Sequence, residues 1–161
     1  FGDDDEALKE AVECDQGSPY STTPLHLACR RRPPLDIIQS LVQASPRVLN
    51  WGDRNDLHQK WLPLHCAAEY RASPDVIELL VKSFPRALEA QTLKGYTPLH
   101  LAVTCQKFKD ANPRPQTLEL LSTPKAFELT TYELEWTALD SFLRSVGFVK
   151  VDNEEDKREI G

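Results

Sequence analysis

Apolar residues recur at helical spacing in three segments of the chain. Residues 37–42 read Ile-Ile-Gln-Ser-Leu-Val, residues 76–81 read Val-Ile-Glu-Leu-Leu-Val, and residues 118–121 read Leu-Glu-Leu-Leu. In the first two segments, apolar side chains stand at i, i+3 and i+4, which places them on one face of an α-helix. The pattern therefore predicts two amphipathic helices and a shortened third. Each of them is followed by a proline-led motif, at 46–49, 85–88 and 124–127.

A second pattern precedes each amphipathic segment. The motif Pro-Leu-His-x-Ala occurs at residues 24–28, 63–67 and 98–102, with offsets of 39 and 35 residues. Proline suits the first turn of a helix, where a missing N–H costs nothing, and a threonine before it can cap that helix. Thr23 and Thr97 fill the capping position, whereas Leu62 replaces it in the second copy and should weaken that helix start by about 1 kcal/mol. Residues 136–140, Trp-Thr-Ala-Leu-Asp, read as a decayed fourth copy.

These motifs closely resemble the ankyrin repeat, whose signature is Thr-Pro-Leu-His-x-Ala followed by a second amphipathic helix. The resemblance covers roughly residues 20–145. It implies an all-α solenoid of stacked helix pairs joined by β-hairpin fingers, since a pair this small cannot bury its apolar stripe alone. We expect repeats at about 20–58, 59–93 and 94–133, a degenerate repeat at 134–147, an N-terminal helix, cap or remnant of an earlier repeat at 1–19, and a charged tail at 148–161.

Composition and charge narrow the possible partners. The chain has 161 residues, of which 40% are apolar and 27% charged, so it can fold around a core. The net charge of -6 lies at the two ends, where residues 3–6 contribute -4 and residues 152–159 contribute -3, which leaves +1 for the middle. We therefore expect neither a nucleic-acid partner nor a polybasic membrane patch. No apolar run approaches the length of a membrane span, so direct membrane insertion is not expected either.

Two further features bear on the setting of the protein. The four cysteines show no Cys-x-x-Cys spacing, and a chain of this size does not need disulfides, so we expect reduced thiols inside a cell, with the cytoplasm favoured. The sequence contains no methionine. We therefore expect it to be a processed product, an excised piece, or the ordered part of something longer.

Candidate catalytic and metal-binding patterns are absent from the sequence. His26, His65 and His100 occur once per repeat, and stacked helices lie about 8–10 Å apart, so the three rings cannot converge on one zinc ion. His65 and Cys66 are adjacent and point about 100° apart on a helix, which rules out a dyad. The glycines are too scattered for a phosphate loop, and no Gly-x-Ser-x-Gly motif exists. We expect no catalytic residue, no metal and no cofactor.

The motif residues are instead expected to be structural. The histidines should hydrogen-bond neighbouring loop backbone and brace the hairpins. The threonines and prolines should define the starts of the first helices. The predicted structural set is Thr23, Pro24, His26, Pro63, His65, Thr97, Pro98 and His100.

The resemblance implies an interaction scaffold or adaptor that binds a partner protein along a concave groove. In ankyrin repeats, the residue before the motif threonine and positions near the end of the first helix usually face that groove. The predicted partner-binding residues are accordingly Trp61, Tyr96, Trp136, Arg30, Arg31, Tyr70 and Glu69. Exposed aromatic and arginine side chains are typical of binding hot spots.

Two alternatives remain open. The rings can simply stack hairpin on hairpin. The run Arg30–Arg32 can be the solvated end of a helix, where cations suit the helix dipole, or it can recognise an acidic partner. At the level of function, the chain can also be a structural subunit permanently docked in a larger assembly. A soluble, well-behaved monomer favours the adaptor, whereas insolubility of the isolated chain favours the docked subunit.

Overall fold

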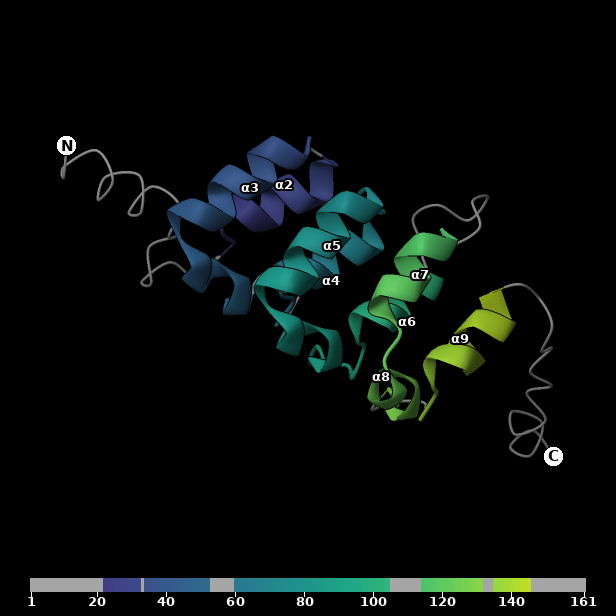
Figure 1. Ribbon diagram of the computed structural model, residues 1–161. Helices are drawn as coiled ribbons and strands as arrows, with labels where there is room; N and C mark the ends of the chain where they lie inside the picture. Colours follow the sequence, from purple (N-terminus) through teal and green to yellow (C-terminus); the bar gives the residue numbers. More distant parts are fainter. Residues whose placement is uncertain (1–21, 33, 53–59, 105–113, 132–134, 146–161) are drawn as a thin grey trace, which may run out of the picture.

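The computed structural model describes residues 22–32, 34–52, 60–104, 114–131 and 135–145. The helix expected within residues 1–19 and the tail expected at 148–161 lie outside these ranges. Three helix pairs follow one another and a single helix ends the series (Figure 1). The pairs are α2 (Pro24–Arg31) with α3 (Leu35–Ala44), α4 (Pro63–Glu69) with α5 (Pro74–Ser83), and α6 (Pro98–Thr104) with α7 (Pro115–Leu121), and the last helix is α9 (Ala138–Ser145).

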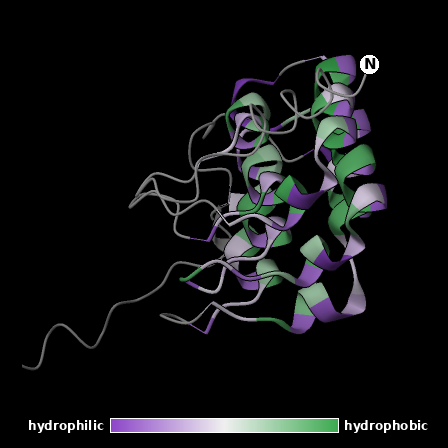
Figure 2. Cartoon of the chain, turned by 90° about the vertical axis from the view of Figure 1, so that its left-hand side faces the viewer, coloured by the Kyte–Doolittle hydropathy of each residue, from purple (hydrophilic) through white to green (hydrophobic). Residues whose placement is uncertain are grey.

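The helices form two rows. Helices α2, α4, α6 and α9 contact one another in that order and make an inner row, while α3, α5 and α7 make an outer row. Each outer helix also contacts the inner helix of its own pair. In Figure 2, hydrophobic and hydrophilic residues alternate along the helices, as expected when one face of each helix is buried. The all-α solenoid is confirmed.

Local sequence explains where these helices begin. Pro24, Pro63 and Pro98 each occupy the first turn of an inner helix. Thr23 caps α2, because its hydroxyl accepts a hydrogen bond from the His26 N–H at 3.4 Å. Ser73 caps α5 in the same way, and Thr123 caps the short helix α8 (Pro124–Glu128). Leu62 has no side chain that could cap α4.

An additional short helix lengthens each repeat beyond the usual 33 residues. The proline-led motifs form η1 (Pro46–Asn50), η2 (Pro85–Glu89) and α8, which begin 39 residues apart. Lys125 of α8 forms an ion pair with Glu89 of η2 at 2.7 Å, so these short helices also stack along the array.

The connection to α6 is a tight turn, and the residues that the structure describes form no strand ladder, only a single β-bridge at Trp61. Thr92 N–H donates to Tyr96 O at 3.0 Å, and Gly95 N–H donates to Thr92 O at 3.0 Å. Gly95 has a φ of 83°, which suits glycine. The physical reason for the missing ladders is length, because η2 ends at Glu89 and α6 begins at Pro98. The short helix has used residues that would otherwise extend the hairpin arms.

Candidate functional site: the edges of the inner helix row

Three histidines hold the turns of neighbouring repeats in place. His26 Nε2 lies 2.9 Å from Trp61 O, and His100 Nε2 lies 3.0 Å from Trp136 O. His65 Nε2 lies 3.1 Å from Ala90 O, which precedes Tyr96, the counterpart of Trp61 and Trp136, by six residues. A carbonyl oxygen can only accept, so each Nε2 carries the proton and donates it. The motif histidines thus link each inner helix to the backbone that precedes the next one.

The opposite ring nitrogen is an acceptor. Leu62 N–H donates to His65 Nδ1 at 3.0 Å. In the flanking repeats a threonine hydroxyl approaches this nitrogen, from Thr23 to His26 and from Thr97 to His100, at 2.8 Å in both cases. Both nitrogens of each ring are therefore engaged within the fold.

Burial keeps the rings of His65 and His100 neutral. Desolvation lowers the pKa of His65 to about 4, although the bond to Ala90 O opposes the shift. Burial also lowers the pKa of His100. A neutral ring with both nitrogens occupied is suited to bracing backbone and not to proton transfer or metal binding.

The described residues hold no group of three His, Cys, Asp or Glu side chains that could bind a metal ion. Cys29 and Cys66 are fully buried thiols, not joined in a disulfide, on the neighbouring helices α2 and α4. Burial, together with the neighbouring Cys66, raises the pKa of Cys29 well above its ordinary value. A buried, protonated thiol is a poor nucleophile.

The aromatic row, defined as Trp61, Tyr96 and Trp136, precedes helices α4, α6 and α9 at equivalent positions. All three residues are half-buried. The Trp61 ring lies 6.5 Å from the His65 ring between centroids, and the Tyr96 ring lies 6.2 Å from the His100 ring in an edge-on arrangement. Trp61 and Tyr96 also pack against the core. The Trp61 and Tyr96 rings therefore each have one side against the array and one side accessible.

The cationic edge lies at the opposite end of the inner helices. It consists of Arg30, Arg31 and Arg32 at the end of α2, Arg71 after α4 and Arg114 before α7. Arg32 Nε donates to Tyr70 O at 2.8 Å, which ties the first repeat to the second at this edge. Tyr70 is half-buried, as is Arg30, whereas Arg31 is exposed.

Arg71 and Arg114 were missed by the motif-based prediction, which considered Arg32 only as part of the run Arg30–Arg32. A signal existed for Arg71, because Arg32 and Arg71 stand 39 residues apart, the same offset as the first two motifs. Both adopt left-handed backbone, with φ of 52° and 56°. They end equivalent helices, which a comparison of the two repeats beyond the motif could have shown.

Glu69 does not belong to the accessible surface. The residue is only 6% exposed, so it presents little surface for the partner contact expected of it. The reason lies in its position at the end of α4, the inner helix that contacts α2 on one side and α6 on the other. A partner cannot reach this carboxylate without displacing a neighbour.

The family model for ankyrin repeats (3 copies) matches residues 1–87, more than half of the chain. The chain belongs to the ankyrin repeat family. No curated protein matches it. Ankyrin repeats generally act as protein–protein interaction modules and are typically non-catalytic. None of the helices in the described ranges is both long and apolar enough to cross a membrane.

The ankyrin array continues beyond the matched residues. Helices α6 and α7 follow the same order and contacts as the two earlier pairs. The bond from His100 to Trp136 O repeats the bond from His26 to Trp61 O, with 36 residues between donor and acceptor in place of 35. The helix α9 thus stands where a fourth inner ankyrin helix belongs.

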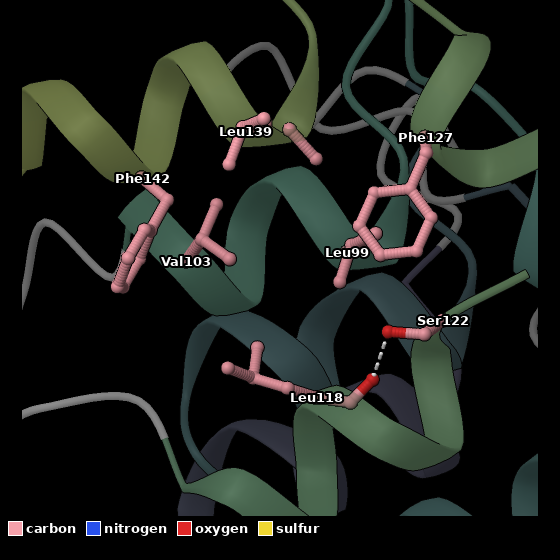
Figure 3. A pocket seen from close by; sticks show the side chains of 8 residues that line it. Leu99, Val103, Leu118, Ser122, Phe127, Leu139 and Phe142 are labelled. Carbon is pink, nitrogen blue, oxygen red and sulfur yellow. Dashed lines mark hydrogen bonds between the residues drawn. The ribbon is translucent and has the colours of Figure 1, made fainter.

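A small apolar cavity lies between the third repeat and α9. Its volume is about 150 Å³, below the roughly 300–1,000 Å³ of typical ligand pockets. Figure 3 shows the side chains around it, which come from α6, α7, α8 and α9. The Ser122 hydroxyl, a polar group of this lining, donates to Leu118 O at 2.6 Å. The lining residues are Leu99, Val103, Leu118, Ser122, Phe127, Ala138, Leu139 and Phe142, so the cavity offers no titratable group.

Proposed function

We propose that this chain is a non-catalytic adaptor that binds a partner protein along the inner helix row, between the aromatic row and the cationic edge. The observation that carries the proposal is the aromatic row. The Trp61 and Tyr96 rings pack against the core and against His65 and His100, yet both residues, like Trp136, are only half-buried. Rigid, partly exposed rings bind with little loss of side-chain entropy, which is typical of hot spots.

The arginines complete this surface. Arg31 is exposed, and Arg30 and Tyr70 are half-buried beside it. Arginine and tyrosine are enriched among residues that dominate binding energies, whereas isolated surface charges contribute little. The surface therefore combines aromatic anchors at one end of the inner helices with cations at the other.

A site-specific crosslink tests this proposal. Tyr96 is replaced by the photo-reactive residue p-benzoylphenylalanine, and the matched control carries the same residue at Lys82, which is exposed on the outer helix α5. We expect a discrete, light-dependent adduct from position 96 in cell extract and none from position 82. Arg31→Glu in the position-96 protein should reduce the adduct. Equal labelling from both positions would contradict the proposed surface.

A permanently docked subunit is the second candidate, and a specific observation favours it. Large apolar side chains are exposed at both ends of the described array, Leu27 at the first inner helix and Leu139 at the last. Exposed apolar side chains of this kind occur at protein interfaces. Sedimentation of the isolated chain separates the candidates, because the adaptor should be a soluble monomer and the docked subunit should associate or precipitate.

The proposal includes an intracellular setting and excludes nucleic acid as the partner. Cys29 and Cys66 are buried thiols outside any disulfide, which supports a reducing compartment. The net charge of -6 opposes binding to a phosphate backbone.

A further inference from the structure

We propose that the cationic edge binds an acidic segment of the partner in polyproline II conformation, with an acidic residue at every third position. This inference rests on the proposed function and adds the chemical class of the partner. It requires that the arginines form a continuous row, that the row attracts carboxylates, and that its spacing matches one peptide conformation better than the others.

Contacts within the fold make the row continuous across three repeats. The hydrogen bond from Arg32 to Tyr70 O brings the end of α2 against the residue that precedes Arg71. Arg71 and Arg114 in turn line the same small depression, together with Ala68 of α4 and Ala102 of α6. The side chains thus follow one edge of the array from the first repeat to the third.

The charge of this edge differs from that of the whole chain. The chain carries -6, whereas the edge gathers five arginines. The acidic residues on the adjoining helices are Asp36 and Asp75, at the starts of α3 and α5, Glu78, which pairs with Lys82, Glu119 of α7, and Glu69, which is buried. Arginine forms forked hydrogen bonds that match carboxylate geometry, so a row of arginines favours a series of carboxylates.

The distance between arginines of successive repeats matches one conformation of a bound peptide better than the others. Packed neighbouring helices lie about 8–10 Å apart, so successive repeats offer arginines at about that distance. A polyproline II helix repeats every three residues with a rise of about 3.1 Å, which returns the same face every 9.3 Å or so. A β-strand alternates faces with a period of two residues, so its third residue points away. An α-helix would need about seven residues to cover the same distance.

Three labelled peptides of nine residues test the inference with the whole chain. The first is three copies of Glu-Pro-Pro, the second replaces each Glu with Gln, and the third has the composition of the first with its three Glu residues placed together. Binding is measured by fluorescence anisotropy at low salt. We expect the first peptide to bind at least about tenfold more tightly than either of the others. Equal binding of the third would overturn the inference, because charge without spacing would then suffice.

Variants of the chain assign the binding to this edge. Arg31→Gln and Arg114→Gln each remove an exposed cation of the row. Each should lower the affinity for the first peptide by about fivefold. Arg47→Gln and Arg86→Gln are the matched controls, because these exposed arginines belong to η1 and η2 and lie outside the row. The controls should change the affinity by less than about twofold. Thermal unfolding checks that each variant retains the wild-type fold, and equal losses in both groups would overturn the inference.

The outcome separates this inference from the proposed function. If no peptide binds but position 96 still crosslinks a partner, the adaptor function is supported and the proposal of an acidic ligand is wrong. If the first peptide binds and position 96 gives no adduct, the cationic edge is a peptide site by itself and the aromatic row is not part of the interface.

Discussion

The middle repeat and the two ends of the array place the same positions in different surroundings. Leu64 in the middle repeat is 2% exposed, whereas Leu139, its equivalent in α9, is 56% exposed. Val76 of α5 is fully buried, whereas Ile37, the matching residue of α3, is 47% exposed. Cys66 and Leu27 show the same contrast. The motif fixes the direction of a side chain, and the neighbouring repeat decides whether that side chain is buried.

This difference in burial indicates which repeat contributes most to the stability of the array. In a solenoid, each repeat contacts only its neighbours, so an inner repeat gains two interfaces and a terminal one gains a single interface. Within the described residues, α4 contacts both α2 and α6, while α9 contacts α6 and the short helix α8. Equivalent substitutions should therefore cost most in the middle repeat.

The largest expected effect compares the two leucines directly. Leu64→Ala should lower the free energy of unfolding by about 2–5 kcal/mol, because a buried side chain is lost between stacked helices. Leu139→Ala should cost less than about 1 kcal/mol, since more than half of the side chain is exposed. Urea titration of both variants measures the difference. Equal losses would mean that the exposed leucine is as important to the fold as the buried one.

The second prediction uses acid to compare the middle repeat with α9. The folded pKa of His65 is about 4 against an ordinary 6.5, so the unfolded chain binds the extra proton between these values. The contribution of the neutral His65 ring to the free energy of unfolding is fully present above pH 6.5. The free energy of unfolding should fall by about 3 kcal/mol as the pH drops to 4. Urea titrations across this range measure the slope. His65→Gln should flatten it, and an unchanged slope would contradict a buried neutral ring.

Asp140 occupies the histidine position in α9 and should respond to acid differently. Its carboxylate accepts hydrogen bonds from Thr137 Oγ1 at 2.6 Å and Thr137 N–H at 2.9 Å. The hydrogen bond from the Thr137 hydroxyl makes the largest contribution to lowering the pKa of Asp140 below its ordinary 3.8. The stabilisation that the Asp140 carboxylate gains from these hydrogen bonds is present above pH 3.8 and is lost as the pH falls below that value. The ionised Asp140 carboxylate also raises the pKa of His100. Asp140→Asn should therefore make the slope between pH 6.5 and 4 slightly steeper, whereas His65→Gln should flatten it.

The third prediction concerns the aromatic row. Trp61→Ala should destabilise the chain by about 1–2 kcal/mol, because its half-buried ring contacts His65 and the core. The bond from His26 to Trp61 O should survive, since it uses only backbone. Trp136→Ala, at the end of the array, should cost less. Thermal unfolding compares the two, and a larger loss at Trp136 would reverse the proposed order of the repeats' stabilities.

Sequence reasoning predicted the repeating framework better than the surface. Pro24, Pro63 and Pro98 begin the inner helices because proline position and apolar spacing are local signals. The burial of Glu69 could not be predicted in this way, since it depends on helices that flank α4 on both sides. The proline-led motifs could be found in the sequence, but the sequence did not show that they form short helices. Their stacking is a tertiary contact, as in the ion pair between Lys125 and Glu89.

The smallest expected effect tests whether that stacking contributes to stability. Lys125→Ala removes the ion pair with Glu89, which links the third repeat to the second. Both side chains are largely exposed, so water and salt screen the attraction and the loss should stay below about 0.5 kcal/mol. Lys82→Ala is the matched control, because its pair with Glu78 lies within the single helix α5 and should be worth a similar amount. A double-mutant cycle with Glu89→Ala isolates the pair energy. A coupling well above that bound would show that the short helices stabilise the interface between repeats, and would make them a third stacking row of the array.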